Sequence, residues 1–258
     1  MSYSYQEFTS RNWLFINEGL QNKISKTKLF FAGCGLGSVI AETAVRVGFS
    51  NFLLVDGDNV EFSNLNRQIF TTEDIGKNKA DATSTILKKI NPLAEIKTVN
   101  SFIEPSNIKN LIGENDYVIN TVDVNETFFE LNKISVGHNK IVLTPLNIGF
   151  GSFLMIFSKD SEKIEEMFDS KNIKSDLDFF YALVEKIGKS KLPRYISSNL
   201  QPLLEGIEDK NVSPQLSIGA NIVASLVVTN IIKIISGQEV PMSPDPILVD
   251  FFENNICR

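Results

Sequence analysis

The chain has 258 residues, of which 43% are hydrophobic and 22% are charged, a composition typical of a globular protein. Its net charge is −6 and no lysine- or arginine-rich block stands out, which argues against a nucleic-acid-binding surface. The two cysteines, Cys34 and Cys257, exclude a disulfide framework and a cysteine-rich zinc site. Because no such zinc site is available, we expect a protein that holds no zinc. The N-terminal residues do not have the profile of a signal peptide, so we also expect it to be cytoplasmic.

Strands and helices are predicted to alternate along the first part of the chain. An apolar run breaks into a glycine-rich segment, and a helical pattern then ends near Gly48. A second helix is predicted from Lys77 to Ile90, because Asn91-Pro92 ends it. The predicted strands are residues 27–32, 51–55, 95–99, 116–120, 140–144 and 152–157, with a further helix at 126–136. This alternation predicts an α/β fold, Rossmann-like and doubly wound, whose mostly parallel sheet carries helices on both faces.

The pattern becomes less regular after the last of these strands. Residues 158–213 are charged and contain helical stretches at 176–188 and 195–207, so we interpret them as a helical excursion. A closing helix and a closing strand follow at 216–235 and 247–252. We therefore expect a single domain of residues 1–258. It comprises an N-terminal arm (1–26), a nucleotide-binding core (27–157), the excursion (158–213) and a closing segment (214–258).

The closing helix is apolar enough to raise the question of a membrane span. Ser217, Asn221, Ser225 and Thr229 recur every four residues, which gives one face of small polar side chains. Such faces let helices approach closely, and Lys233 interrupts the apolar run. We therefore favour a buried core or interface helix over a membrane span, and expect no membrane partner.

Three glycines lie between the first predicted strand and its helix. Backbone N–H groups of Gly33, Gly35 and Gly37 and the helix N-terminus can hold a phosphate there. Asp56 follows the next strand, 19 residues after Gly37, where an acid commonly binds a ribose hydroxyl. A tight turn without a ligand is the alternative, but the position of the acid favours nucleotide binding. These residues alone fit an NAD-dependent oxidoreductase equally well.

The polar stretch VDGDNVEFSNLNRQ, residues 55–68, separates these possibilities. Asn64 and Arg67 lie in it, and Lys79 follows Arg67 by twelve residues. A triphosphate needs such positive charge before another anion can approach its α-phosphorus, whereas a dinucleotide does not. Asp123 follows a predicted strand and could hold Mg²⁺, which prefers carboxylate and phosphate oxygens. The sequence therefore favours ATP with Mg²⁺ over NAD.

The run D-x-D-x-V-E-x-S-N-L-N-R-Q resembles the adenylating enzymes of the ThiF/MoeB/HesA group, which are relatives of ubiquitin-activating enzymes. The resemblance extends from Arg11 to about Phe157 and returns over residues 214–250. It implies that Asp56 takes the ribose of ATP and that Asp58 lies beside the phosphates, where it could assist the metal. Phosphate contacts are implied for three residues: Asn64, Arg67 and Lys79.

The resemblance also implies a metal ligand, a dimer and a reaction. Asp123 would hold Mg²⁺, and Arg11 would reach the ATP of the partner protomer in a homodimer. A carboxylate would attack the α-phosphorus of ATP and give an acyl-adenylate and pyrophosphate, assisted by Arg67, Lys79, Asp123 and Arg11. The expected partner is a small ubiquitin-like sulfur-carrier protein, or a peptide, with a free C-terminal carboxylate.

The chain departs from the family pattern in several places. Ala32 and Cys34 replace two glycines of the loop, so contacts to adenine or phosphate could be altered, and Cys34 would face the phosphates. Residues 151–256 contain no cysteine for a thioester, and the two C-x-x-C pairs that hold zinc in many members are absent. Three further hypotheses stay open: a relative that activates a carboxylate on a tRNA nucleoside, a nucleotide-binding scaffold that has lost catalysis, and the oxidoreductase.

Overall fold

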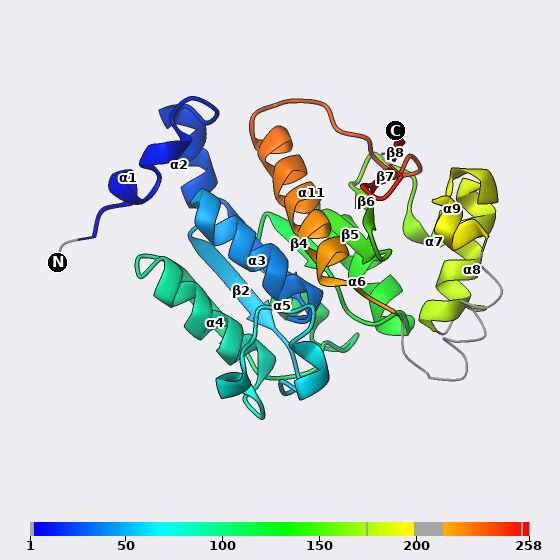
Figure 1. Ribbon diagram of the computed structural model, residues 1–258, viewed down its shortest axis with the longest axis horizontal. Coiled ribbons are helices and arrows are strands. Elements are labelled where there is room, and N and C mark those ends of the chain that lie inside the picture. Colours follow the sequence, from blue (N-terminus) through cyan, green and yellow to red (C-terminus); the bar gives the residue numbers. More distant parts are fainter. Residues whose placement is uncertain (1–2, 174, 199–213, 254, 258) are drawn as a thin grey trace.

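A single sheet organises the chain. The computed structural model describes residues 3–173, 175–198, 214–253 and 255–257, and these ranges form eight strands in the order β3-β2-β1-β4-β5-β6-β7-β8 (Figure 1). The strands are β1 (Lys28–Ala32), β2 (Asn51–Val55), β3 (Glu95–Val99), β4 (Tyr117–Asn120), β5 (Ile141–Asn147), β6 (Gly151–Phe157), β7 (Ile247–Asp250) and β8 (Asn255–Cys257). Strands β1 to β5 pair in parallel, whereas β6, β7 and β8 each pair antiparallel with the preceding strand.

Helices cover both faces of this sheet, which confirms the predicted α/β class. The helices are α1 (Tyr5–Phe8), α2 (Glu18–Lys26), α3 (Leu36–Val47), α4 (Lys79–Ile90), α5 (Ile108–Ile112), α6 (Glu126–Gly137), α7 (Ile164–Met167), α8 (Asp176–Ile187), α9 (Arg194–Ser197) and α11 (Ser217–Ile235). Short 3₁₀ turns are η1 (Ser10–Asn12), η2 (Phe62–Asn64), η3 (Thr72–Asp74) and η4 (Lys189–Lys191). Figure 1 shows α3, α4 and α11 together on one face of the sheet.

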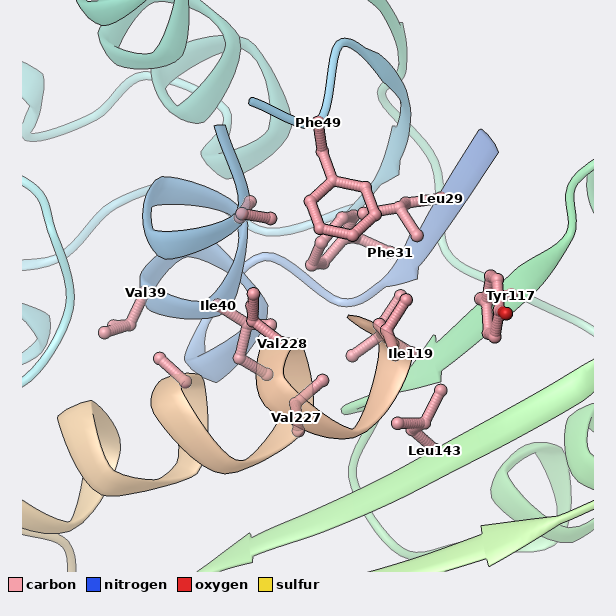
Figure 2. Close-up of a cluster of buried hydrophobic side chains, with 14 of the residues drawn as sticks. Leu29, Phe31, Val39, Ile40, Phe49, Tyr117, Ile119, Leu143, Val227 and Val228 are labelled. Carbon is pink, nitrogen blue, oxygen red and sulfur yellow. The ribbon is translucent and has the colours of Figure 1, made fainter. Parts of the chain in front are cut away.

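Strand β1 contributes to two separate hydrophobic cores. Leu29 and Phe31 belong to a cluster that includes side chains of α3 and α11, while Phe30 and Ala32 belong to a second cluster with side chains of α6. All four residues are fully buried, since successive side chains of a strand point to opposite faces and both faces are covered. Figure 2 shows the first cluster, in which Ile40 of α3 lies beside Val228 of α11.

The long apolar helix α11 is a core element of this structure. Its length and composition would allow it to cross a membrane, but it packs against α3, β5 and β6 and half of its apolar window is buried. The small polar side chains found in the sequence, Ser217, Asn221, Ser225 and Thr229, lie on its exposed side. Burial in the core accounts for the apolar composition of the rest of the helix.

The predicted elements differ from the observed ones mainly at their ends. Helix α4 begins at Lys79 rather than Lys77, because the Asn78 side chain accepts hydrogen bonds from the N–H groups of Ala80 and Asp81 and caps the helix there. Strand β5 continues to Asn147, paired with β6. The short helices α1, α2, α5 and α7 and strand β8 were not predicted. Of the helix predicted at 195–207, residues 195–197 are helical, and residues 199–207 lie outside the described residues.

Candidate active site

A pocket of about 920 Å³ opens at the carboxyl ends of β1, β2, β4 and β5. The strand order changes direction between β1 and β4, and ligands of open α/β sheets bind at such switch points. Eight of the predicted site residues line the pocket: Gly33, Gly35, Asp56, Asp58, Asn64, Arg67, Lys79 and Asp123. The fold thus brings together residues that are up to 90 positions apart in the sequence. Two predicted residues, Gly37 and Arg11, do not line it.

The glycine loop requires glycine at its first position. Gly33 has a φ of +93°, and a Cβ there would lie 2.8 Å from the carbonyl oxygen of Thr121. Its N–H donates a hydrogen bond to the Val55 carbonyl, so the turn is held close to β2. Gly37 is buried, and a Cβ there would lie 3.1 Å from the Thr121 hydroxyl. Its lack of a side chain allows α3 to pack closely, and its part in phosphate binding stays a prediction.

Ala32 and Cys34 do not obstruct the loop. Among the loop residues only Gly33 has a positive φ, so neither replacement stands where glycine is required. The Cys34 side chain is fully buried in the hydrophobic core, and it does not face the phosphates as the sequence suggested. Burial is the main cause that raises the pKa of the Cys34 thiol well above its ordinary value, and the negative charge of Asp56 adds to it. Both replacements are therefore compatible with an open pocket.

Asp56 joins the glycine loop to the loop that follows β2. Its Oδ2 accepts a hydrogen bond of 2.6 Å from the Cys34 N–H, and its Oδ1 accepts one of 2.8 Å from the Asp58 N–H. Burial raises the pKa of this carboxyl, while the two N–H donors oppose the rise. A carboxylate has further lone pairs, so a ribose hydroxyl can still donate to Asp56 from the pocket side.

Lys79 supplies positive charge at the start of α4. Its Nζ lies 3.0 Å from Asp58 Oδ2, and its N–H donates to the Asp58 carbonyl. The Lys79 side chain is only 13% exposed, whereas that of Asp58 is 52% exposed. An incoming phosphate can therefore replace the exposed carboxylate as the partner of a lysine that is already in place.

Arg67 is the second cation that lines the pocket. Its Nε donates to Gln215 Oε1 at 2.9 Å, and its Nη1 lies 2.8 Å from the Ser63 carbonyl oxygen and 2.9 Å from Asn66 Oδ1. Within the described part of the chain no carboxylate forms an ion pair with Arg67. Neutral acceptors thus orient the guanidinium and leave its charge available to an anion, for which its planar fork is well suited.

Asn64 has a structural role in addition to its place in the pocket wall. It is buried, and its Oδ1 accepts a hydrogen bond of 3.0 Å from the Glu61 N–H. Its own N–H donates back to the Glu61 carbonyl, which closes the η2 turn. This turn fixes the path of the loop three residues before Arg67.

Asp123 lies on the pocket wall, three residues beyond the end of β4. Loss of solvent contact raises its pKa, and the nearby carboxylates of Asp176 and Asp58 raise it further. A cation would relieve this repulsion. No three His, Cys, Asp or Glu side chains of the described residues converge on a metal-sized site, so a Mg²⁺ ion here would take most of its ligands from phosphate and water. That arrangement is common for Mg²⁺, and the residues present fit it.

The structure adds pocket residues that the sequence did not single out. The Thr121 hydroxyl lies 3.0 Å from the carbonyl oxygens of Ala32 and Gly33 and locks the loop. Phe102, 62% exposed, lies directly over Gly57, where a Cβ would come within 2.6 Å of its ring. Two further additions are Gln68, whose Oε1 is buried without a partner, and Asp176, which accepts a hydrogen bond from the Val124 N–H. Only Gln68 had a usable signal, since it directly follows Arg67.

Arg11 lies apart from the pocket of its own chain. It is exposed on η1, between α1 and α2, and no ion pair involves it among the described residues. Trp13, Leu14 and Phe15 follow it and are 74%, 68% and 84% exposed. Its contribution to the ATP site of a second protomer stays a prediction.

Known proteins match this chain over its whole length or over part of it. It is 30% identical over 147 residues to the sulfur carrier protein ThiS adenylyltransferase of Escherichia coli. These residues make up 57% of this chain and 59% of that protein. It is 33% identical over 110 residues to the tRNA threonylcarbamoyladenosine dehydratase of Haemophilus influenzae, covering 40% of this chain and 42% of that protein. The matches thus span less than two thirds of either relative.

Structural similarity extends further than sequence similarity. The crystal structure of E. coli MccB with ATP superimposes with a TM-score of 0.72 at 20% identity, covering 100% of this chain and 72% of that one. At this level of identity the likeness establishes the fold. The profile of the ThiF family matches residues 9–258, which is nearly the whole chain. The chain therefore belongs to the ThiF family, within the E1-like adenylyltransferase superfamily.

Proposed function

We propose that this protein is an ATP-dependent adenylyltransferase that activates the C-terminal carboxylate of a small ubiquitin-like sulfur-carrier protein or of a peptide. The observation that carries the proposal is that Arg67 and Lys79 line the same pocket as the α3 N-terminus and Asp123. Two cations and a helix N-terminus favour a polyphosphate, and the carboxylate of Asp123, close to those of Asp58 and Asp176, favours its metal. The family membership supports the same reaction.

The proposed chemistry depends on position and charge. The substrate carboxylate is already ionised at neutral pH, so its oxygen attacks the α-phosphorus without a general base, and pyrophosphate leaves. Arg67 and Lys79 bind the phosphate oxygens and reduce the repulsion between the two anions. Asp56 orients the ribose, and the exposed ring of Phe102 offers a surface for the base. Asp123 would hold Mg²⁺, which neutralises phosphate charge when bound.

Cysteine chemistry on this chain is not part of the proposal. Cys34 is fully buried with a raised pKa, so it cannot serve as an accessible thiolate. The side chain of Cys257 lies outside the described residues. We propose that catalysis stops at the acyl-adenylate, with transfer of the acyl group left to a separate acceptor.

ATP-dependent pyrophosphate exchange, together with calorimetry, tests the proposal. ATP with Mg²⁺ is expected to bind far better than NAD, and exchange is expected once a suitable carboxylate is present. Tight NAD binding without ATP binding would favour the oxidoreductase. ATP binding without exchange for any carboxylate would favour the scaffold.

A tRNA nucleoside is the second candidate substrate. The 33% identity to the tRNA threonylcarbamoyladenosine dehydratase favours it, and the net charge of −6 argues against it. Exchange that depends on added tRNA, and on no peptide or carrier protein, would establish this alternative.

A further inference from the structure

The part of the pocket that is left for the carboxylate substrate can be located from the sheet order. Asp56 follows β2 and Phe102 follows β3, so the ribose and base of the proposed ATP lie on the β2–β3 side of β1. Strands β4, β5 and β6 lie on the other side of β1. We call the pocket wall on that side, formed by residues 124–150, by α8 and α9 and by residues 214–216, the acyl wall. The assignment rests on the proposed function.

Most residues of the acyl wall are apolar, and its uncharged polar residues are Asn125, Thr127, Asn147, Tyr195 and Gln215. Among its described lining residues only Asp176 is charged, and no lysine or arginine is present. Leu146, Ile148, Phe150 and Phe180 are each partly exposed to the pocket while they pack against the hydrophobic core or an aromatic neighbour. Apolar surface of this kind is better covered by an apolar group than by water.

Part of the acyl wall is also rigid. The Tyr195 ring packs edge-to-face on Phe150, with ring centroids 5.6 Å apart, and Phe150 stacks on Phe252 at 4.8 Å. The Tyr195 hydroxyl is held 2.6 Å from Asp250 Oδ2, and Asp250 is fully buried. Phe252 is 63% exposed, so an aromatic surface continues from the pocket to the outside of the protein. Such a fixed surface loses little conformational entropy when a ligand covers it.

We propose that the carboxylate substrate carries an apolar or aromatic side chain within its last two residues, in contact with the acyl wall. A substrate that ends in two glycines has no side chain at these positions and is the natural comparison. Two glycines have no side chains with which to displace water from Phe150 and Phe180. A leucine or phenylalanine at the same place buries apolar area against them and gains affinity in proportion. Arg67 borders the acyl wall, because its Nε donates a hydrogen bond of 2.9 Å to Gln215 Oε1, so the phosphates it would bind lie beside the apolar surface.

Two synthetic heptapeptides that share their first five residues test this inference. One ends in Gly-Gly and the other in Leu-Phe. In ATP-dependent pyrophosphate exchange by the full chain, the Leu-Phe peptide is expected to have a kcat/KM higher by about tenfold or more. Phe180→Ser is expected to remove most of that advantage without changing the Kd for ATP. Tyr181→Ser, at the next position of α8 and outside this pocket, is the matched control and should retain it.

Several results would overturn the inference. One is a Gly-Gly peptide that is used as well as the Leu-Phe peptide or better, and another is an equal response of both peptides to Phe180→Ser. ATP binding that persists while calorimetry detects neither peptide on the ATP-loaded protein also refutes it, and leaves the nucleotide site standing. Absence of ATP binding is a failure of the proposed function itself, and the inference falls with it.

Discussion

Replacing Arg67 by lysine tests whether the orientation of the guanidinium, and not only its charge, serves ATP. In the structure Gln215, Ser63 and Asn66 accept hydrogen bonds from Nε and Nη1, so the fork is fixed before a ligand arrives. Lysine keeps the charge but cannot make these contacts together with a two-point contact to phosphate. One lost charge-assisted hydrogen bond corresponds to roughly 1.5–3 kcal/mol, or a Kd for ATP that is roughly tenfold to 150-fold higher.

Calorimetry with ATP and Mg²⁺ at fixed ionic strength measures this Kd, and thermal unfolding followed by circular dichroism shows that the variant is folded. Arg46→Lys is the matched control, because Arg46 pairs with Glu42 on the surface of α3, away from the pocket. That exposed pair contributes at most about 1 kcal/mol to stability, and its loss should leave the Kd unchanged. A folded Arg67→Lys protein that binds ATP within about twofold of the wild type would refute the reasoning.

Three further predictions follow from neighbouring contacts. Tyr195→Phe removes a hydrogen bond to the buried Asp250. It should lower the free energy of unfolding by about 2 kcal/mol, or the melting temperature by roughly 4–8 °C. Tyr181→Phe should have no such effect in the same melting experiment. Because the pKa of Asp123 is raised, its carboxylate is lost on acidification at a pH above the ordinary aspartate value of 3.8. Affinity for ATP with Mg²⁺ should therefore fall as the pH is lowered through that raised pKa. Asp123→Asn should bind weakly with a smaller fall in a calorimetric pH series, because the raised pKa of Asp56 leaves a fall of its own. Finally, mixing Arg11→Ala protein with Asp123→Ala protein should restore about a quarter of the activity if protomers exchange at random, because about a quarter of the sites would then have both residues. No recovery despite verified exchange would rule out the idea that Arg11 of one protomer completes the site of the other.

The sheet and most of the pocket wall could be predicted from the sequence. Strand β2 is an apolar run, and the edge strand β3 is rich in the β-branched residues Ile96, Thr98 and Val99, so both were predicted with the observed ends. The carboxyl ends of parallel strands meet at one edge, which is why Asp56 and Asp123 face the same pocket. Helix α2 was missed because few of its residues are buried, and its main signal is the Asn17 side chain that accepts a hydrogen bond from the Leu20 N–H.

Other features depend on contacts between distant residues or on side-chain direction. Asp176 reaches the loop after β4 from 52 residues away, and Gln215 reaches Arg67 across 148. No local pattern contains such distances. The direction of Cys34 could not be predicted either, because a helix N-terminus can turn a side chain toward a ligand or into the core, and packing of the surrounding elements decides which.

The contacts of the glycine loop have a consequence for the order in which the protein can fold. The Gly33 N–H bonds to the Val55 carbonyl, and the Ala32 carbonyl accepts from the Thr121 N–H, so three parallel strands must dock before the loop has its shape. Parallel strands are joined only by long crossovers, which makes their pairing a late and slow event. A nascent chain that ends before β4 therefore has no formed phosphate loop, and ATP cannot assist folding until about half of the protein has been synthesised.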